Sequence, residues 1–240
     1  MQQSKTIIIT GSSSGIGLSL CKHYLTDGYS VIGLARRTNS LLSEFSNYTH
    51  VTIDLNDLEA IKNWIHSVKS YIKNIKLVVL NAGILGEIKR MEETSILEAK
   101  SVFEVNLWAN KNMIDELILQ KINCQQIVAI SSGASKNGNA GWGAYSISKA
   151  ALNILIQTYA AENPEIHFSA VAPGLVDTAM QDYIYELKSE KEFPSLQFLQ
   201  AAKGTENMPT PSALAPKLAA LFTKIKLEEQ SGIYTDIRIN

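Results

Sequence analysis

Residues 10–17 read Thr10-Gly11-Ser12-Ser13-Ser14-Gly15-Ile16-Gly17 and follow the apolar run Thr6-Ile7-Ile8-Ile9 near the start of the 240-residue chain. Three glycines between a predicted strand and a predicted helix permit a tight turn, and the first N–H groups of such a helix can hold a phosphate. The spacing differs from the commoner G-x-G-x-x-G and lacks the Gly-Lys-Ser/Thr of nucleoside triphosphatases, which disfavours a kinase or ATPase. We therefore expect this loop to bind the pyrophosphate of a dinucleotide, with a purely structural turn as the alternative. The expected contacts are Gly11, Ser13, Ser14, Gly15, Ile16 and Gly17.

Short apolar runs alternate with amphipathic stretches along the chain. The runs show little polar alternation, which is typical of parallel strands covered on both faces. The stretches between them carry the 3.6-residue period of helices. This βαβ alternation predicts a single-domain α/β fold, a doubly wound parallel sheet of the Rossmann type. The expected strands are 5–10, 30–34, 51–53, 77–80, 126–131 and 167–172, and the expected helices are 16–26, 58–71, 95–119 and 145–161.

Composition bounds the class of protein. With 240 residues and 45% hydrophobic content, the chain suffices for one α/β domain over residues 1–240. Its 22 basic and 23 acidic residues are interspersed and give a net charge of −1, so no basic stripe indicates a nucleic-acid partner. The sequence opens without a signal-peptide pattern and has no apolar run approaching about 18 residues, so we expect a cytoplasmic protein without a membrane segment.

The cysteines and histidines do not follow a metal-ligand pattern. Cys21 and Cys124 fit neither a metal spacing nor a disulfide framework, and we expect both thiols to pack in the core. The histidines are scattered, and we expect them in surface or packing positions without acidic partners. They are His23, His50, His66 and His167. The sequence therefore predicts no metal site.

The segment Tyr145-Ser146-Ile147-Ser148-Lys149 follows Ser132 by thirteen residues. A tyrosine and a lysine four residues apart share one face of a helix, so the ammonium can lie near the phenol and favour its ionised form. Because a free phenol titrates near ~10, such a shift would make Tyr145 a usable acid and base. A chance Y-x-x-x-K is expected in a chain of this composition, and the glycine loop and Ser132 give the pair its weight. Together these features indicate nicotinamide-dependent carbonyl or alcohol chemistry.

The end of the second predicted strand indicates which dinucleotide is bound. Residues 31–37 read Val-Ile-Gly-Leu-Ala-Arg-Arg and lack the acidic residue that binds a free ribose 2′-hydroxyl. Arg36 and Arg37 offer guanidinium groups that match a 2′-phosphate, so we expect NADP(H), with solvated surface arginines as the alternative. After the third strand, Asp54 and Leu55 are candidates for the adenine edge, or else Asp54 caps the helix that starts near residue 58.

One irregular stretch, residues 180–211, mixes aromatic and charged residues with three prolines at positions 194, 209 and 211. Loops of this length are usually functional or disordered. We expect a substrate lid here, with a partly ordered insertion as an equal alternative.

Six motifs are specific in combination. They are Thr10-Gly-x-x-x-Gly-Ile-Gly17, Asn81-Ala82-Gly83, Asn106, Ser132, Tyr145-x-x-x-Lys149 and Pro173-Gly174-Leu175-Val176-Asp177-Thr178. In their order and spacing, the sequence resembles the short-chain dehydrogenase/reductase family over nearly its whole length. Residues 141–145 and 176–181 are similar to the branch that contains sepiapterin reductase and the benzil reductase that forms (S)-benzoin.

The resemblance implies a catalytic group of four residues. Tyr145 would give its proton to a carbonyl oxygen, and Ser132 would hydrogen-bond the same oxygen. Lys149 would lower the tyrosine pKa and hold the ribose hydroxyls beside the nicotinamide. Asn106, in the long predicted helix, would position a water that links Lys149 to solvent.

The resemblance also implies cofactor contacts at the carboxyl edge of the sheet. The segment Asn81-Ala82-Gly83 would line the cofactor ribose. Val176 and Thr178 would meet the nicotinamide carboxamide, and the turn Pro173-Gly174 would belong to the same surface.

The expected function is that of an NADPH-dependent carbonyl reductase acting on a ketone or diketone. An apolar wall suited to an aromatic or bulky carbonyl is expected, with helix packing as an alternative role for its tryptophan; the candidates are Leu85, Trp142, Met180 and Tyr183. Related folds run epimerisations and dehydrations with the same tyrosine and lysine, and a catalytically silent NADP-binding sensor or scaffold is a further alternative.

The helix expected over residues 95–119 carries more apolar residues than one sheet face needs. They are Val102, Val105, Leu107, Trp108, Met113, Ile114 and Leu117. Family members similar to this sequence pair through this helix and the one that bears the tyrosine, which implies a homodimer or homotetramer.

Overall fold

A computed structural model describes residues 5–72, 74–187 and 193–239. Its strands are β1 Thr6–Thr10, β2 Ser30–Ala35, β3 Tyr48–Thr52, β4 Asn74–Leu80, β5 Asn123–Cys124, β6 Gln126–Ile130, β7 His167–Ala172 and β8 Ile233–Asp236. Its α-helices are α1 Gly15–Thr26, α2 Ser40–Ser43, α3 Leu58–Val68, α4 Ile96–Phe103, α5 Ala109–Leu119, α6 Gly143–Glu162, α7 Ala179–Glu186, α8 Pro194–Ala202 and α9 Pro211–Glu228.

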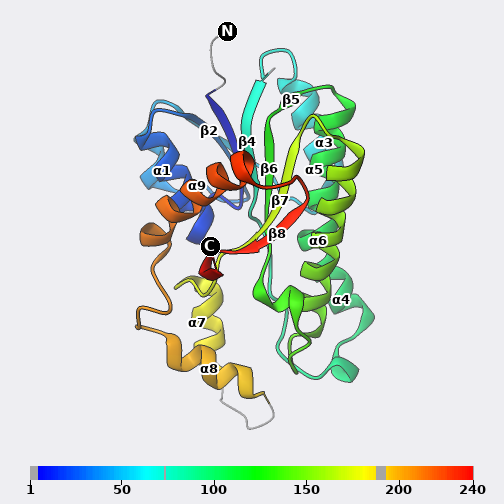
Figure 1. Ribbon diagram of the computed structural model, residues 1–240, viewed down its shortest axis with the longest axis vertical. Coiled ribbons are helices and arrows are strands. Elements are labelled where there is room, and N and C mark those ends of the chain that lie inside the picture. Colours follow the sequence, from blue (N-terminus) through cyan, green and yellow to red (C-terminus); the bar gives the residue numbers. More distant parts are fainter. Residues whose placement is uncertain (1–4, 73, 188–192, 240) are drawn as a thin grey trace.

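The strands form one eight-stranded sheet with helices on both faces, which confirms the predicted single-domain, doubly wound α/β fold (Figure 1). Seven strands follow the order β3-β2-β1-β4-β6-β7-β8, and the short β5 pairs with β4. Every pairing between these strands is parallel. All their carboxyl ends therefore lie at one edge, where ligands bind in open α/β sheets.

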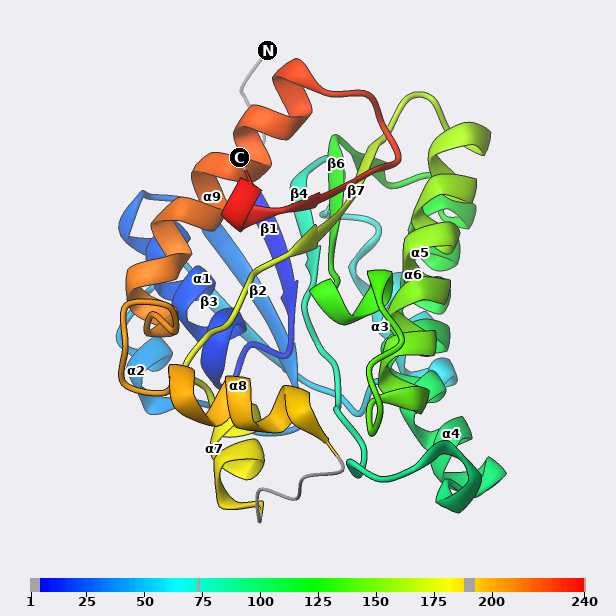
Figure 2. The ribbon, with the colours of Figure 1, turned by 60° about the horizontal axis from the view of Figure 1, so that its bottom comes forward.

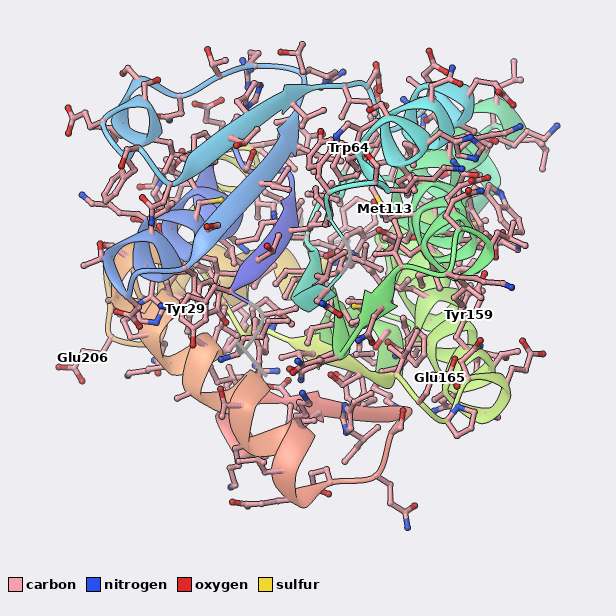
Figure 3. All side chains as sticks on the ribbon, turned by 90° about the horizontal axis from the view of Figure 1, so that it is seen from above. Tyr29, Trp64, Met113, Tyr159, Glu165 and Glu206 are labelled. Carbon is pink, nitrogen blue, oxygen red and sulfur yellow. The ribbon has the colours of Figure 1, made fainter. Side chains whose placement is uncertain are left out.

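Alternate residues of the central strands pack against opposite layers of helices. On β1, Ile8 belongs to the cluster formed with α3, α5 and α6, whereas Ile7 belongs to the cluster formed with α1 and α9. Figure 3 shows Met113 and Tyr159 on the first side of the sheet and Tyr29 on the other. Because apolar helices cover both faces, the strands need no polar residues at alternate positions.

Most predicted elements agree closely with the structure, and three boundaries differ by three residues for clear reasons. β4 begins at Asn74 rather than 77, because its first residues pair with the short β5. β3 begins at Tyr48, three residues before the expected start. It is an edge strand, so its polar residues still pair with β2 through their backbone while their side chains remain partly exposed. α3 ends at Val68 rather than 71, since the chain then turns and inserts the buried Ile72 into the core.

The helix expected over residues 95–119 is interrupted. A π-helical segment, Glu104–Trp108, separates α4 from α5. At its centre the fully buried Asn106 bonds both backbone groups of Ile84: its Oδ1 accepts from the Ile84 N–H at 2.8 Å and its Nδ2 donates to the Ile84 carbonyl at 2.9 Å. The π-helical turn, which is wider than an α-helical turn, therefore coincides with a buried polar side chain. Short π-helical segments are frequently found at functional sites.

Two elements near the C-terminus were not predicted. α9 begins with Thr210 as N-cap, whose hydroxyl accepts from the Ala213 N–H at 3.3 Å, and with Pro211 in its first turn. A threonine followed by a proline is a helix-start signal, so this helix was detectable. β8 extends the sheet beside β7. Neither α9 nor any other helix in the described residues combines the length and apolar character needed to cross a membrane.

The stretch 180–211, expected to be a lid or a partly ordered insertion, contains most of α7 and all of α8. Residues 188–192 lie outside the described residues. In Figures 1 and 2 the two helices lie beyond the carboxyl ends of the central strands. This position sets them beside the edge of the sheet where a ligand would bind.

Candidate functional site

A cavity of about 620 Å³ opens at the carboxyl edge of the sheet, a size typical of small-molecule sites. Of the site residues expected from the sequence, Gly17 and Asn106 do not line it. The expected residues that do are Gly11, Ser13, Ser14, Gly15, Ile16, Arg36, Arg37, Asp54, Leu55, Asn81, Ala82, Gly83, Ser132, Tyr145, Lys149, Pro173, Gly174, Val176 and Thr178.

The glycine loop follows β1 with a tight turn that glycine accommodates best at two positions. Gly11 and Gly15 have φ values of 68° and 56°, which side chains rarely tolerate. A Cβ on Gly17 would lie 2.3 Å from the Gly11 carbonyl oxygen, so Gly17 serves the close packing of α1 on the turn rather than the cavity surface. The side chain of the N-cap Ser14 makes no capping bond, so the N-terminus of α1 presents its N–H groups at the cavity. The loop therefore fits a dinucleotide phosphate.

Asn81 joins the ends of β1 and β4. Its Nδ2 donates to the Thr10 carbonyl at 2.9 Å, and the N–H groups of Asn81 and Ala82 both donate to the Thr10 hydroxyl at 3.0 Å. The polar groups at this point of the edge are thereby held in fixed positions. Asn81 has a structural role in addition to its place in the cavity lining.

Arg36 and Arg37 follow β2 and are exposed beside the same cavity. Arg36 Nη1 lies 4.0 Å from Asp54 Oδ2, a loose pair between side chains that are 72% and 48% exposed. Such pairs contribute little, so Arg36 is available to a ligand. The alternative that Asp54 caps α3 is wrong, because Asp57 is the N-cap and accepts from the Ala60 N–H at 2.9 Å.

Ser132, after the end of β6, and Tyr145, in the first turn of α6, are neighbours in the cavity wall. Burial raises the pKa of Tyr145, and the hydrogen bond with the Ser132 side chain acts in the opposite direction. The Ser132 hydroxyl also accepts from the Ala134 N–H at 3.1 Å, which helps to orient it. The phenol therefore carries its proton at neutral pH, as a proton donor must.

Burial dominates the pKa of Tyr145, which is raised, whereas the sequence suggested that Lys149 would lower it. Lys149 Nζ lies 5.9 Å from the centre of the Tyr145 ring and donates to the Ile130 carbonyl at 2.8 Å. The side chain is only 3% exposed, and burial lowers the pKa of Lys149 to about 8. The carbonyl bond turns the ammonium toward the sheet, a geometry that helical spacing alone does not reveal.

Asn106 lies behind the cavity and connects the π-helical segment to α6. In addition to its bonds with Ile84, its Nδ2 donates to Ser148 Oγ at 3.0 Å, and Ser148 Oγ donates to the Tyr145 carbonyl at 2.7 Å. A Cβ on Gly83 would lie 3.2 Å from Asn106 Oδ1 and 3.3 Å from Lys149 Nζ. Glycine at this position thus allows the asparagine and the lysine to approach the backbone.

Asn153 is a residue of the site that the sequence interpretation missed. It lies on α6, is 5% exposed, and accepts from Ser131 Oγ at 2.6 Å while donating to Ser135 Oγ at 2.8 Å. Ser135 Oγ in turn donates to the Ser132 carbonyl at 2.6 Å. The spacing of four residues from Lys149 places Asn153 near the same helix face, which is the signal that would have identified it.

The outer part of the cavity is largely apolar. Leu85, Trp142 and Met180 line it as expected, and Trp142 is also held in place because its Nε1 donates to Ser195 Oγ at 2.7 Å. The expectation for Tyr183 is wrong: its side chain is 39% exposed and is not in the lining, because α7 turns it outward. Instead, Ile184 of the same helix lines the cavity.

Histidines and cysteines lie away from this chemistry. His23 and His66 do have acidic neighbours, contrary to expectation, at 3.6 Å from Asp27 and 3.7 Å from Glu116. Helical spacing explains the first pair and packing of α3 on α5 the second. Cys21 and Cys124 belong to the two apolar clusters, which confirms their packing role. Within the described residues, no three His, Cys, Asp or Glu side chains are grouped as metal ligands would be.

Comparisons with known proteins agree on one family. A family model described as short chain dehydrogenase matches residues 5–188. Benzil reductase ((S)-benzoin forming) of Bacillus cereus is 31% identical over 233 residues, covering 90% of this chain and 93% of that protein. Benzil reductase ((S)-benzoin forming) IRC24 of Saccharomyces cerevisiae is 31% identical over 249 residues, covering 96% and 94%.

The structure also has a counterpart among solved structures. The crystal structure of the YIR035C short-chain dehydrogenase/reductase from Saccharomyces cerevisiae matches with a TM-score of 0.84 at 26% identity. The match covers 98% of this chain and 96% of that one. The similarity therefore extends over both the glycine loop and the carboxyl edge of the sheet.

Proposed function

Because the chain belongs to the short-chain dehydrogenase family and is thus an oxidoreductase, we propose that it is an NADPH-dependent carbonyl reductase acting on a ketone or diketone. The observation that carries the proposal is that Ser132, Tyr145 and Lys149 line one cavity together with the glycine loop. The relatives named benzil reductase support a carbonyl substrate. Residues 1–240 act as one catalytic unit.

In this proposal the bound dinucleotide supplies the hydride that reduces the carbonyl carbon. Tyr145 donates its proton to the carbonyl oxygen, and Ser132 hydrogen-bonds that oxygen as negative charge develops there. The raised pKa of Tyr145 keeps the phenol protonated until the oxygen becomes basic enough to take the proton. Lys149 supplies positive charge to the cavity from its position beside the Ile130 carbonyl. Asn106 fixes the first turns of α6 relative to the π-helical segment through its hydrogen bond to Ser148.

The choice of NADPH rests on the end of β2. The small, buried Ala35 stands where an acidic residue would bind a free 2′-hydroxyl, and Arg36 and Arg37 follow it at the cavity. A guanidinium group matches the geometry of a phosphate, and among the described residues the one ion pair formed by either arginine is the exposed pair of Arg36 with Asp54. These features favour a 2′-phosphorylated cofactor.

The segment formed by α7 and α8 acts as a lid over the apolar part of the cavity, where the substrate would bind. Ile184, Phe193 and Leu196 pack with Leu85 and Trp142 in an apolar cluster separate from the two clusters that flank the sheet. Excluding water from this region strengthens the hydrogen bonds that stabilise the reacting oxygen. A bulky or aromatic carbonyl compound suits such a wall.

The function is tested with Tyr145→Phe, which removes the phenol but keeps the ring. Turnover of a diketone with NADPH should fall by about 10²- to 10⁴-fold, the loss expected for a general acid, while NADPH binding by fluorescence stays unchanged. Tyr71→Phe, which changes a tyrosine that is 70% exposed, is the matched control. Near-normal turnover in Tyr145→Phe would remove the residue from the mechanism.

The same assay separates the alternatives. One alcohol formed for each NADPH consumed supports a reductase, while product formed without net NADPH consumption indicates an epimerase or dehydratase. Tight NADPH binding with no turnover of diketones, pterins or ketosteroids indicates a sensor or scaffold.

A further inference from the structure

Arg238 is a charged residue of the cavity that the mechanism above does not use. It lies in the 3₁₀ turn Ile237–Ile239 that follows β8, and its side chain is part of the lining. A Cβ on Gly133 would lie 3.1 Å from Arg238 Nη2, and one on Gly174 would lie 3.3 Å from Arg238 Cδ. The guanidinium group therefore lies beside the residue that directly follows Ser132. Since consecutive Cα atoms are 3.8 Å apart, it is within roughly 8 Å of the Ser132 Cα.

A buried carboxylate holds this guanidinium group in place. Arg238 Nε donates to Asp236 Oδ1 at 2.8 Å and Nη2 donates to Asp236 Oδ2 at 2.6 Å. The Asp236 side chain is 10% exposed, whereas that of Arg238 is 55% exposed. A guanidinium group has five N–H donors, and this two-point contact uses two of them. No other hydrogen bond of this guanidinium group is found among the residues that the structure describes, so three N–H donors remain for a ligand on a group whose orientation is already set.

The surroundings indicate what kind of ligand would use these donors. The lining that Arg238 shares includes a group of apolar residues, which are Leu85, Trp142, Met180 and Ile184. A purely apolar substrate would cover the exposed N–H groups without bonding them, which is costly for a charged group. A carboxylate matches the fork of a guanidinium in two-point geometry. The only carboxylate among the described lining residues, Asp54, lies at the opposite end beside Arg36.

We propose that Arg238 is a specificity residue that binds a carboxylate close to the reacting carbonyl, so that the substrate class is an apolar or aromatic keto acid. The proposal rests on the proposed reductase function and narrows its substrate. The carbonyl carbon accepts a hydride from the reduced dinucleotide, which is thereby oxidised, and the oxygen accepts a proton from Tyr145. The product is the hydroxy acid, with its carboxylate unchanged on Arg238.

The test compares phenylglyoxylate with the neutral diketone 1-phenylpropane-1,2-dione, both with NADPH. Wild type should prefer the acid in kcat/KM, and Arg238→Met should lower the ratio of acid to diketone by about ten- to a hundredfold. Arg238→Lys keeps the charge but loses the paired N–H donors of the guanidinium, so its ratio of acid to diketone should lie between those of wild type and Arg238→Met. Arg90→Met, which removes an exposed arginine outside the cavity, is the control for net charge. Thermal unfolding shows whether each variant is folded.

Binding gives a second readout. The product analogue mandelate, titrated calorimetrically into protein with saturating NADP⁺, should bind wild type but bind Arg238→Met about tenfold or more weakly. An unchanged ratio of acid to diketone and unchanged mandelate binding in a folded Arg238→Met would overturn the inference while leaving the reductase proposal intact. If wild type reduces neither compound, yet mandelate binding depends on Arg238, the reductase proposal fails and the carboxylate site stands.

Discussion

Asn153 offers a sharp test of how Ser132, the proposed catalytic serine, is held. Asn153→Ala removes the acceptor of Ser131 Oγ and the donor to Ser135 Oγ, two bonds of 2.6 Å and 2.8 Å. Ser135 supports the Ser132 carbonyl, so the change reaches Ser132 through one intermediate residue. Asn153 itself is not in the cavity lining, which makes it a positioning residue.

The magnitude follows from burial. Ser131 is 2% exposed, and a buried hydroxyl left without its partner costs about 1–3 kcal/mol. With the small void left by truncation, we expect a loss of about 2–4 kcal/mol in the free energy of unfolding. For a chain of this size that corresponds to a fall in Tm of about 4–16 °C.

Turnover should also fall, but by a limited amount. A displacement of about 1 Å in a catalytic group can cost about 10²-fold. The Tyr234 hydroxyl also donates to the Ser132 carbonyl, at 3.3 Å, which keeps part of the turn in place. We therefore expect kcat to fall by about ten- to a hundredfold, with the KM for NADPH unchanged.

Two further variants separate positioning from stability. Ser135→Ala removes the bond to the Ser132 carbonyl and also the acceptor of the buried Asn153 Nδ2, so it should cost about 1–3 kcal/mol. It should lower kcat like Asn153→Ala. Thr158→Val removes an exposed hydrogen bond to Ile154 on the same helix and should change neither quantity by much. The assays are thermal unfolding and steady-state kinetics well below the Tm. If both Asn153→Ala and Ser135→Ala are destabilised but retain wild-type kcat, Ser132 does not depend on this chain of bonds.

Three other predictions concern charge, cofactor and assembly. Burial lowers the pKa of Lys149 to about 8 from an ordinary value near 10.5, so between these values the unfolded chain binds more protons than the folded one. The free energy of unfolding should therefore rise with pH over this range by at most about 3 kcal/mol relative to Lys149→Met, and parallel pH curves for the two proteins would contradict this. Wild type should bind NADPH about ten- to a hundredfold more tightly than NADH, and Ala35→Asp combined with Arg36→Ala should reverse this preference. Equal binding of NADPH and NADH by wild type at matched ionic strength would refute the role of the arginines. Light scattering at micromolar concentration should give two or four chain masses, and Ile154→Lys, at a position of α6 that is 61% exposed, should shift the protein toward the monomer; a monomeric wild type would disprove pairing.

The basis for the assembly prediction changes with the structure. Most apolar residues of the long helical region that suggested pairing are buried within the chain, among them Leu107, Met113 and Leu117. The exposed apolar surface that remains on this region and on α6 includes Trp108, Leu119, Ile147 and Ile154. Hydrophobic periodicity counts apolar positions but does not separate those covered by the chain's own sheet from those that remain outside.

Much of the fold was predictable because glycine positions and hydrophobic runs within short segments determine its strands and turns. The strand-to-helix turn at Gly11 and the apolar runs of the central strands depend on neighbouring residues only. The π-helical segment around Asn106 was not predictable in the same way, since one extra residue in a helix hardly disturbs the apolar period. α9 was missed because Pro211 was interpreted as part of an irregular stretch rather than as the first residue of a helix.

The candidate site divides along similar lines. Ser132, Tyr145 and Lys149 were identified from spacing, and the structure places all three in one cavity. The bond from Lys149 to Ile130 depends on how α6 packs against β6, which no local pattern describes. Arg238 lies more than one hundred residues from Ser132 in sequence and reaches Gly133 only because β8 pairs beside β7.

The cavity is built from two portions of the chain, and the family model covers only the first of them. The family model ends at residue 188, and the groups that would handle the proton, Ser132 and Tyr145, lie before that point. Phe198, Leu199 and Arg238 contribute to the same cavity from beyond it. Part of the cavity lining is therefore encoded apart from the residues that would transfer the proton, although Leu85, Trp142, Met180 and Ile184 precede residue 188. Exchanging the segment after residue 188 between relatives is a route to new substrates that leaves the proton-transfer residues untouched.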